Sequence, residues 1–278
     1  MTTDIWHWLA DPWTGDIMRR AFAEIVLLGI AGGAIGCWIV LNELSYGAES
    51  LPHAMFPGLV IAALTSIPLL VGGGVGLLAA AVVIAVAART PLIGRDSAIA
   101  VVVTALFGLG VLLALSPSSP QSVQSLLFGD ILGVSVRDLI AAGALTLVVV
   151  VVLRLLHTRL LVTSFDRTTA PSMGVAPLPM DIALLVLLAV SVLIAVQALG
   201  NLLVVALLIA PAAAARLLAK RLLPMMLTAV ALAIAGGFAG LYVSYHLRTA
   251  AGASIALALV ATYLLAALAA RIVPRRTA

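Results

Sequence analysis

Charged residues are scarce in this chain, and their scarcity excludes most classes of protein. They make up 9% of the 278 residues, against about 25% in ordinary soluble domains. A soluble globule of this length needs a polar surface, and the chain has too few polar side chains to cover one. We therefore exclude soluble enzymes, disordered proteins and secreted domains, and we expect a protein that lies in a membrane.

Cysteine and lysine are almost absent as well. Cys37 is the only cysteine, so the chain forms no internal disulfide and no thiolate metal cluster. Lys220 is the only lysine, and it lacks the preceding glycines of the phosphate-binding loop GxxxxGK[ST]. The sequence also lacks the HExxH and Ser/His/Asp patterns of hydrolases. We expect no enzymatic activity of its own and no permanently bound cofactor.

Long apolar runs dominate what is present. Hydrophobic residues make up 64% of the chain, and residues 182–215 contain no charge over 34 positions. A membrane-spanning helix needs about 20 mostly apolar residues. Aromatic residues are only 5% and the runs are continuous rather than alternating, which favours a helical bundle over an outer-membrane barrel. The sequence predicts an all-α polytopic transmembrane bundle of eight or nine spans with broken or short helices, near residues 21–41, 54–70, 71–88, 98–115, 138–153, 182–198, 200–215, 222–245 and 252–270.

Two connections leave the number of spans open. Residues 54–88 turn either at Ser66-Ile67-Pro68 or at Gly72-Gly73-Gly74, and residues 182–215 are too long for one comfortable span. Gly200-Asn201 is the expected break in the second stretch. Nine spans place the N-terminus outside the cell, and eight place it inside.

Basic residues predict the orientation of the helices. The chain has a net charge of +4 and a pI of about 9.8. Its basic residues fall in clusters between apolar runs, which is typical of cytoplasmic loops. We therefore expect these clusters and the C-terminus in the cytoplasm, and no binding of nucleic acid. Four clusters hold 11 of the 15 basic residues: Arg89 and Arg95; Arg154, Arg159 and Arg167; Arg216, Lys220 and Arg221; and Arg271, Arg275 and Arg276.

The first 18 residues differ from the rest of the chain. Residues 1–18 lack the basic start and apolar core of a signal peptide, and they contain three of the four tryptophans. Tryptophan favours the headgroup region of a membrane. We expect residues 1–18 to form an N-terminal interfacial segment, and residues 19–278 to form a single transmembrane domain in the plasma membrane.

One pair of ionisable residues stands out among the apolar runs. Glu49 and His53 are four positions apart, which places both side chains on one face of a helix. An intramembrane charge is costly and marks a functional site by default. A carboxylate and an imidazole suit a divalent first-row metal ion, and two ligands suit a transported ion that must leave again. Pro52 and Pro57 predict a broken helix here, which is tolerated where it lines a cavity.

The spacing alone leaves a structural interpretation open beside the metal site. In that interpretation Glu49 caps a helix and His53 is hydrogen-bonded in a turn. His246, near the expected external end of a span, is a weak third metal candidate and is more typical of an interfacial residue. His157 lies among arginines and is interpreted as a solvated cytoplasmic residue.

Glycine pairs four positions apart recur along the chain. Such spacing lets helix backbones approach closely in a membrane. Together the pairs predict a tightly packed bundle and point to a homodimer. They are Gly29/Gly33, Gly32/Gly36, Gly72/Gly76 and Gly236/Gly240.

Several motifs, taken in order, resemble a known family. Residues 41–58 read Leu-Asn-Glu-Leu-Ser-Tyr-Gly-Ala-Glu-Ser-Leu-Pro-His-Ala-Met-Phe-Pro-Gly, and residues 127–133 read Leu-Phe-Gly-Asp-Ile-Leu-Gly. Ser164-Phe165-Asp166 and the segment 196–215 follow at family-like spacing. From about Ala21 to Ile272 the chain resembles the membrane permeases of ATP-binding-cassette (ABC) importers for manganese, zinc and iron.

The resemblance implies a function and a set of partners. The domain 19–278 would be a permease that forms a homodimer or a pseudo-dimer. It would bind a cytoplasmic dimer of ABC ATPases and receive metal from an extracytoplasmic binding protein. Glu49 stands where the family has an aspartate and His53 where it has a histidine, so both are expected to contact zinc or manganese in transit. The family's ATPase-docking helix maps to about residues 212–222, which implies a coupling role for Ala212, Arg216, Lys220 and Arg221.

Two other functions stand beside the ATP-driven importer. A secondary metal transporter or channel would need no ATPase, and Glu49 and His53 would then carry protons. A non-transporting membrane anchor would use its few intramembrane polar groups for packing. Metal transport that requires ATP separates the importer from both alternatives.

Overall fold

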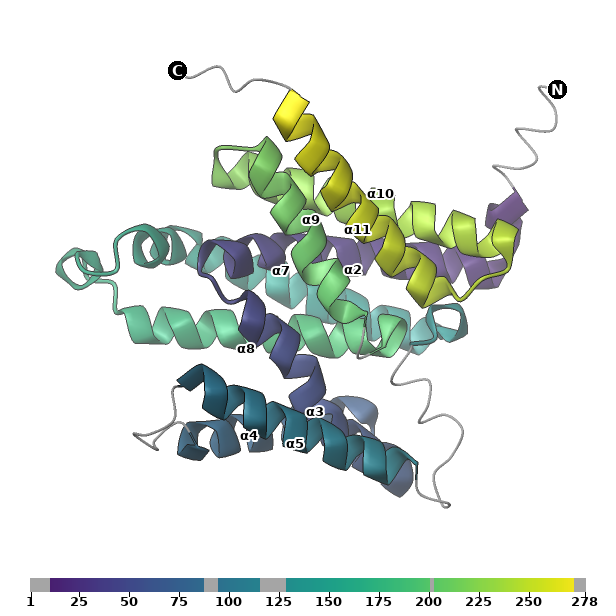
Figure 1. The fold of residues 1–278 in the computed structure, drawn as a ribbon, viewed down its shortest axis with the longest axis horizontal. Helices are drawn as coiled ribbons and strands as arrows, with labels where there is room; N and C mark the ends of the chain where they lie inside the picture. Colours follow the sequence, from purple (N-terminus) through teal and green to yellow (C-terminus); the bar gives the residue numbers. More distant parts are fainter. Residues whose placement is uncertain (1–10, 88–94, 116–128, 201–202, 273–278) are drawn as a thin grey trace.

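The computed structural model describes residues 11–87, 95–115, 129–200 and 203–272. Within these ranges the chain is helical and has no β-strand, which confirms the predicted all-α class. Long helices occupy all the predicted apolar runs (Figure 1). The elements are α2 (Asp16–Leu41), α3 (Ser45–Thr65), α4 (Leu69–Ala87), α5 (Arg95–Ala114), η1 (Ile131–Gly133), α7 (Val136–Phe165), η2 (Ala170–Met173), α8 (Pro177–Leu199), α9 (Val204–Leu218), α10 (Leu222–Leu247) and α11 (Ala251–Ile272).

The structure shows where the chain turns in the two stretches that the sequence leaves open, residues 54–88 and 182–215. The chain turns after α3 at Ser66, which has a φ of 58°, and Pro68 immediately precedes α4. The turn therefore lies at residues 66–68, and the glycines at 72–74 lie inside α4. Helix α8 ends at Gly200, whose φ of 78° is one that glycine adopts without strain. The predicted break at Gly200 is confirmed, while Asn201 lies outside the described residues.

Helix α7 begins at a capping box and extends further than the sequence predicts. The Ser135 hydroxyl accepts a hydrogen bond from the Asp138 amide at 3.3 Å, and the Asp138 carboxylate accepts one from the Ser135 amide at 3.0 Å. The predicted helix over 138–153 continues to Phe165. Arginine is a good helix former, and its long side chain can reach polar surroundings, so Arg154 does not end the helix.

The glycine pairs bring helices of the same chain into backbone contact. A Cβ atom at Gly33 of α2 would lie 2.8 Å from the Val230 Cα of α10, and one at Gly36 would collide with the Leu208 carbonyl of α9. The predicted tight bundle is confirmed, and the glycine contacts described here lie within one chain. The partners are α10 for Gly29/Gly33, α9 for Gly32/Gly36, α3 for Gly72/Gly76 and α11 for Gly236/Gly240.

Helix α2 lies at the centre of the larger of two helix groups. It packs against α7, α8, α9 and α10, and its Phe22 and Trp38 side chains are almost completely buried. Helices α3, α4 and α5 pack on one another and form a second group below α8 in Figure 1. Helix α3 also contacts α2, α8 and α9. The candidate metal ligands on α3 therefore lie where the two groups meet.

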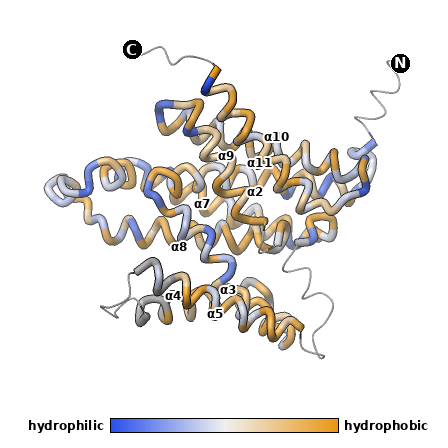
Figure 2. The backbone as a smooth tube through the Cα atoms, viewed as in Figure 1, coloured by the Kyte–Doolittle hydropathy of each residue, from blue (hydrophilic) through white to orange (hydrophobic). Residues whose placement is uncertain are grey.

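The outer surface of the bundle suits a membrane. Figure 2 shows hydrophobic colours along the helices and hydrophilic colours near several helix ends. Large apolar side chains such as Leu112, Leu155 and Ile272 are more than 70% exposed, as expected of a surface that faces lipid. A multi-pass membrane protein is confirmed. Five described helices are long and apolar enough to span a membrane: Asp16–Leu41, Val136–Phe165, Pro177–Val196, Leu222–Leu247 and Ala251–Ile272.

Three helix ends that carry residues of the predicted cytoplasmic clusters, Arg95, Arg159 and Arg216, lie on one side of the molecule. Helix α5 begins, and α7 and α9 end, on the left of Figure 1. Helix α2 begins on the opposite side, where Trp13 donates a hydrogen bond to the Tyr242 hydroxyl at 2.6 Å and stacks on Phe22. The described part of the predicted interfacial segment 1–18 thus packs on α2 and α10, and residues 1–10 lie outside the described residues.

Candidate functional site

Glu49 and His53 lie one helical turn apart near the start of α3. They share a face of the helix, as their spacing predicts, and they are close enough to interact electrostatically. The Glu49 side chain is exposed and His53 is half-buried. The pair therefore opens onto the surface of this chain rather than into its hydrophobic core.

Aromatic packing between α3 and α5 supports the His53 imidazole. The ring of Phe107 on α5 lies edge-on to the His53 ring, with centroids 4.8 Å apart. Phe107 in turn lies 5.5 Å from the fully buried ring of Phe56. Such edge-to-face contacts restrict the orientation of a ring. The contact with Phe107 therefore holds the His53 imidazole in place one helical turn from Glu49.

The two prolines do not break α3, and the predicted broken helix at this site is wrong. Helix α3 runs from Ser45 to Thr65 with Pro52 and Pro57 inside it, both buried. Pro52 only removes the amide that would bond the Ala48 carbonyl. The chain direction changes earlier, between α2 and α3, where Glu43 has a φ of 57°. Packing against α4 and α5 holds α3 helical through both prolines.

The structure also bears on the interpretation of Glu49 as a helix cap. The N-cap of α3 is Leu44, and no side chain caps this end of the helix. Glu49 lies beyond the first turn, so its carboxylate is not needed by the backbone there. The carboxylate is therefore available for a ligand.

One chain supplies few metal ligands at this place. Among the described residues no three His, Cys, Asp or Glu side chains lie close enough to hold one ion. His246 lies in the last turn of α10 beside the Tyr245 ring, with centroids 5.1 Å apart, and the structure does not bring it to Glu49 and His53. Cys37 is fully buried in the contact between α2 and α9. Transition metals take roughly four to six ligands, so the Glu49–His53 pair is half a site at most.

The predicted coupling residues are divided between core and surface. Ala212 is fully buried in α9, so its side chain contacts no partner protein directly. Arg216 in the last turn of α9, and Lys220 and Arg221 in the connection to α10, are exposed. A shallow cavity of about 350 Å³ borders residues 216–220. The exposed part of the predicted docking segment is therefore cationic and short.

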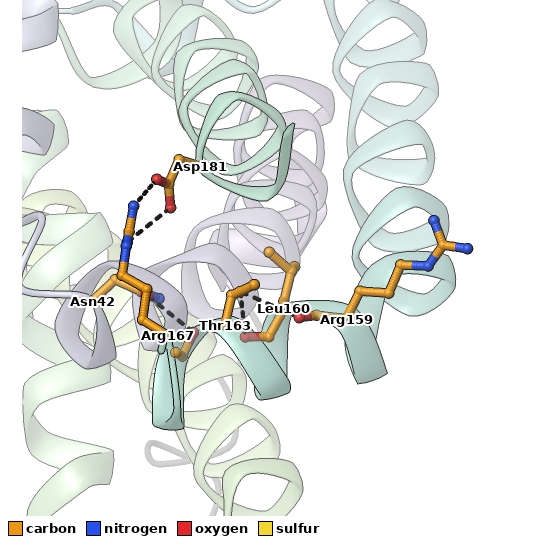
Figure 3. Close-up of polar contacts among 7 residues, drawn as sticks. Asn42, Arg159, Leu160, Thr163, Arg167 and Asp181 are labelled. Atoms are coloured by element: carbon orange, nitrogen blue, oxygen red, sulfur yellow. Dashed lines mark hydrogen bonds and ion pairs between the residues drawn. The ribbon is translucent and has the colours of Figure 1, made fainter. Parts of the chain in front are cut away.

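Polar contacts join α7, α2 and α8 at the end of the bundle that carries the basic residues (Figure 3). The Ser164 hydroxyl donates a hydrogen bond to the Asn42 side-chain oxygen at 2.9 Å. The Arg167 guanidinium forms a bidentate ion pair with the Asp181 carboxylate. The Arg159 side chain points away from these contacts in Figure 3. Arg167 of the predicted basic cluster is thus tied to α8 by an ion pair.

The motif Ser164-Phe165-Asp166 forms the C-terminal end of α7, with Asp166 as the C-cap. The Asp166 carboxylate accepts hydrogen bonds from the Thr169 amide at 3.0 Å and the Thr168 hydroxyl at 2.9 Å. Hydrogen bonds from Thr169, together with those from Thr168, lower the pKa of Asp166 below its usual value. Asp166 therefore stays ionised and fixes the turn that leads into η2.

Comparison of the sequence with models of known protein families shows to which family the chain belongs. The model of the ABC 3 transport family matches residues 14–270, which is almost the whole chain. The chain belongs to the ABC 3 transport family. The resemblance drawn from the motifs is confirmed.

Named relatives and a solved structure agree with this ABC 3 assignment. The manganese import system permease protein ScaB of Streptococcus parasanguinis is 33% identical over 240 residues, which is 86% of this chain and 86% of ScaB. The manganese transport system membrane protein MntB of Synechocystis is 30% identical over 264 residues, 94% of this chain and 85% of MntB. The structure of PsaBC from Streptococcus pneumoniae in complex with Fab matches with a TM-score of 0.88 at 29% identity and covers 94% of this chain and 95% of that one.

The contacts of two aromatic side chains in this ABC 3 family chain could not be predicted from the sequence. Phe107 lies in an apolar helix with no motif around it, and only the packing of α5 on α3 brings it to His53. His157 is less exposed than its interpretation as a solvated residue predicts. It is half-buried, and its ring lies edge-on to the buried Trp38 with centroids 5.8 Å apart. Neither contact has a signal in the local sequence.

Proposed function

We propose that this chain is the membrane permease of an ATP-driven ABC importer that moves a divalent transition-metal ion into the cytoplasm. The observation that carries the proposal is the Glu49–His53 pair on the regular helix α3, with an exposed carboxylate and a packed imidazole. Oxygen and imidazole nitrogen form a donor set for divalent first-row metals. The Glu49 carboxylate does not cap α3, which leaves it available for a metal ion.

A second copy of the chain completes the metal site in this proposal. The pair faces out of its own chain, and one chain contributes two ligands. Two copies related by a two-fold axis would contribute two carboxylates and two imidazoles, which is a full tetrahedral set or most of an octahedral one. The ligand count therefore supports the proposed homodimer, whereas the glycine pairs make contacts within one chain.

Manganese is the substrate to test first, with zinc second. ScaB and MntB carry manganese in their names. Manganese favours oxygen ligands more than zinc does, and Glu49 supplies a carboxylate of longer reach than the aspartate of the family pattern. The ion is cargo, so no resident metal or cofactor is needed.

The energy for transport comes from separate subunits in this proposal. The chain lacks a phosphate-binding loop, and a cytoplasmic ATPase dimer would dock at the exposed connection that carries Arg216, Lys220 and Arg221. This orientation places the C-terminus in the cytoplasm and the start of α2 outside, where an extracytoplasmic binding protein would deliver the ion. No observation favours the ATP-independent transporter.

Metal uptake tests this function directly. Cells that express the chain with its ATPase and binding protein would be assayed for radiolabelled manganese and zinc, beside the His53→Ala variant. We expect ATP-dependent uptake of one metal and at least a tenfold loss in the variant, because even outer-shell partners of a metal are worth 10–100-fold. Co-purification of the ATPase with both proteins shows that the complex is intact. Normal uptake by His53→Ala would exclude His53 as a metal ligand. Uptake without ATP would exclude an ATP-driven importer.

A further inference from the structure

A groove on a different face of the bundle has no part in the proposed metal path. It lies between α2, α7 and α10 and encloses about 300 Å³, which is the low end of the size of ligand sites. Apolar side chains form most of its wall, including Ala34 of α2, Val150 of α7 and Met226 of α10. Arg154 and His157 of α7 form the rest. The groove is thus apolar along its length and basic at one end.

The depth of the basic end matches a membrane boundary. Arg154 follows the first residue of α7 by about five turns, or ~27 Å along the helix axis. The hydrocarbon core of a bilayer is about 30 Å thick. In the orientation proposed for the chain, with the start of α7 at the outer boundary of the membrane, Arg154 lies near the cytoplasmic edge of the hydrocarbon. His157 lies about one turn closer to the cytoplasm on the same face. Lipid phosphates occupy this level.

Nothing in the described chain neutralises the basic end. Arg154 has no ion pair or hydrogen bond with another described residue, unlike Arg167, which pairs with Asp181. No carboxylate lines the groove. His157 is held by its contact with Trp38 and is half-buried at the groove wall. The end of the groove therefore attracts an anion.

We propose that this groove binds an anionic phospholipid of the cytoplasmic leaflet. Arg154 and His157 contact the phosphate, and one acyl chain lies along the apolar wall between α7 and α10. Basic pockets between transmembrane helices on the cytoplasmic side bind anionic headgroups in this way. A free phosphate ion would leave the apolar wall exposed to water, whereas a lipid matches both parts of the groove.

Lipid retention by the purified chain tests the proposal. Native mass spectrometry would count phosphatidylglycerol and phosphatidylcholine bound to the full chain in detergent over a lipid titration. We expect one phosphatidylglycerol per chain, bound at least tenfold more tightly than phosphatidylcholine. The variant Arg154→Gln with His157→Gln should lose this preference. Arg159→Gln, an exposed arginine of α7 outside the groove, should keep it, and soluble glycerol phosphate should not compete.

A second variant separates the groove from surface charge. Val150→Trp fills the apolar wall and leaves both basic side chains in place, so we expect it to lose phosphatidylglycerol. Val151→Trp places the same bulk on an exposed position that does not line the groove, and it should bind as the parent does. Equal binding by the parent and Val150→Trp, or equal loss in Arg159→Gln, would overturn the proposal. Thermal unfolding of each variant confirms that it is folded.

Discussion

At the scale of single residues, the function proposed for this ABC 3 family member rests on two side chains with different surroundings. The Glu49 carboxylate is exposed, and the His53 imidazole is held between its own helix and Phe107. A packed ring with a fixed orientation is a precise ligand, whereas a longer, exposed carboxylate can follow the ion as it enters and leaves. The charge of Glu49 should therefore matter more than its length.

Substitution of Glu49 separates charge from length. Glu49→Gln keeps the size of the side chain and removes the carboxylate, so we expect at least a tenfold loss of metal uptake. Glu49→Asp keeps the carboxylate and restores the residue of the family pattern, so uptake should stay within a few-fold of the parent. Glu43→Gln is the matched control, because Glu43 is exposed and precedes α3. Radiolabelled uptake measures all three, and normal transport by Glu49→Gln would exclude a ligand role.

At the scale of helices, close glycine contacts set the distances between elements. Gly33 allows α2 to approach α10 so closely that an added methyl group would meet backbone atoms of Val230, which cannot move aside as a side chain can. Overpacking of this kind lowers the free energy of unfolding by about 1–3 kcal/mol. At Gly143 of α7 the nearest atom to an added Cβ is the Leu27 Cδ1 at 3.8 Å, an ordinary contact.

These two glycines make a matched stability test. Gly33→Ala should lower the midpoint of thermal unfolding of the purified chain, because the clash outweighs the gain in helix propensity. Gly143→Ala should leave the midpoint unchanged or raise it, since alanine is favoured over glycine in a helix by about 1 kcal/mol. Circular dichroism at 222 nm in detergent measures both. A more stable Gly33→Ala protein would contradict the close contact of α2 with α10.

The same scale shows what the sequence can and cannot predict. Apolar runs and glycine spacing predict the helices and their tight packing because burial and backbone approach are local requirements. The prediction of a break at Pro52 and Pro57 fails because packing against α4 and α5 outweighs the missing backbone hydrogen bonds. The support of His53 by Phe107 could not be predicted, since it depends on how α5 packs on α3. The burial of Ala212 likewise depends on helix packing and has no local signal.

The connection between α9 and α10 can be tested by charge reversal. Lys220→Glu with Arg221→Glu should weaken co-purification of the ATPase on the order of tenfold at physiological salt, because exposed interface charges act through long-range attraction. The effect should shrink as salt is added. Arg19→Glu with Arg137→Glu changes the same charge at the opposite end of the bundle and should leave co-purification intact. Equal retention of the ATPase by both double variants would place the docking surface elsewhere.

At the scale of the whole molecule, the chain is incomplete as a metal transporter. The candidate ligand pair Glu49–His53 lies at the surface of the chain, and the described residues place no third candidate ligand beside it. The sequence also lacks the phosphate-binding loop GxxxxGK[ST]. In the proposed complex a second copy of the chain supplies the further metal ligands, and the ATPase dimer supplies the ATP-binding loop. A metal site shared between two copies has a consequence that independent sites would not have: damage to one copy affects the transport of both.

Mixed dimers test this consequence. Two copies with different affinity tags, of which only one carries His53→Ala, would be co-expressed and purified through both tags with the ATPase. If the ion is held by ligands from both copies, loss of one imidazole removes a quarter of the shared set, and uptake into proteoliposomes should fall well below half of the parent value. If each copy has its own path, the intact copy keeps about half of the activity. Retention of half the uptake per dimer would therefore exclude the shared site while leaving His53 as a ligand within each chain.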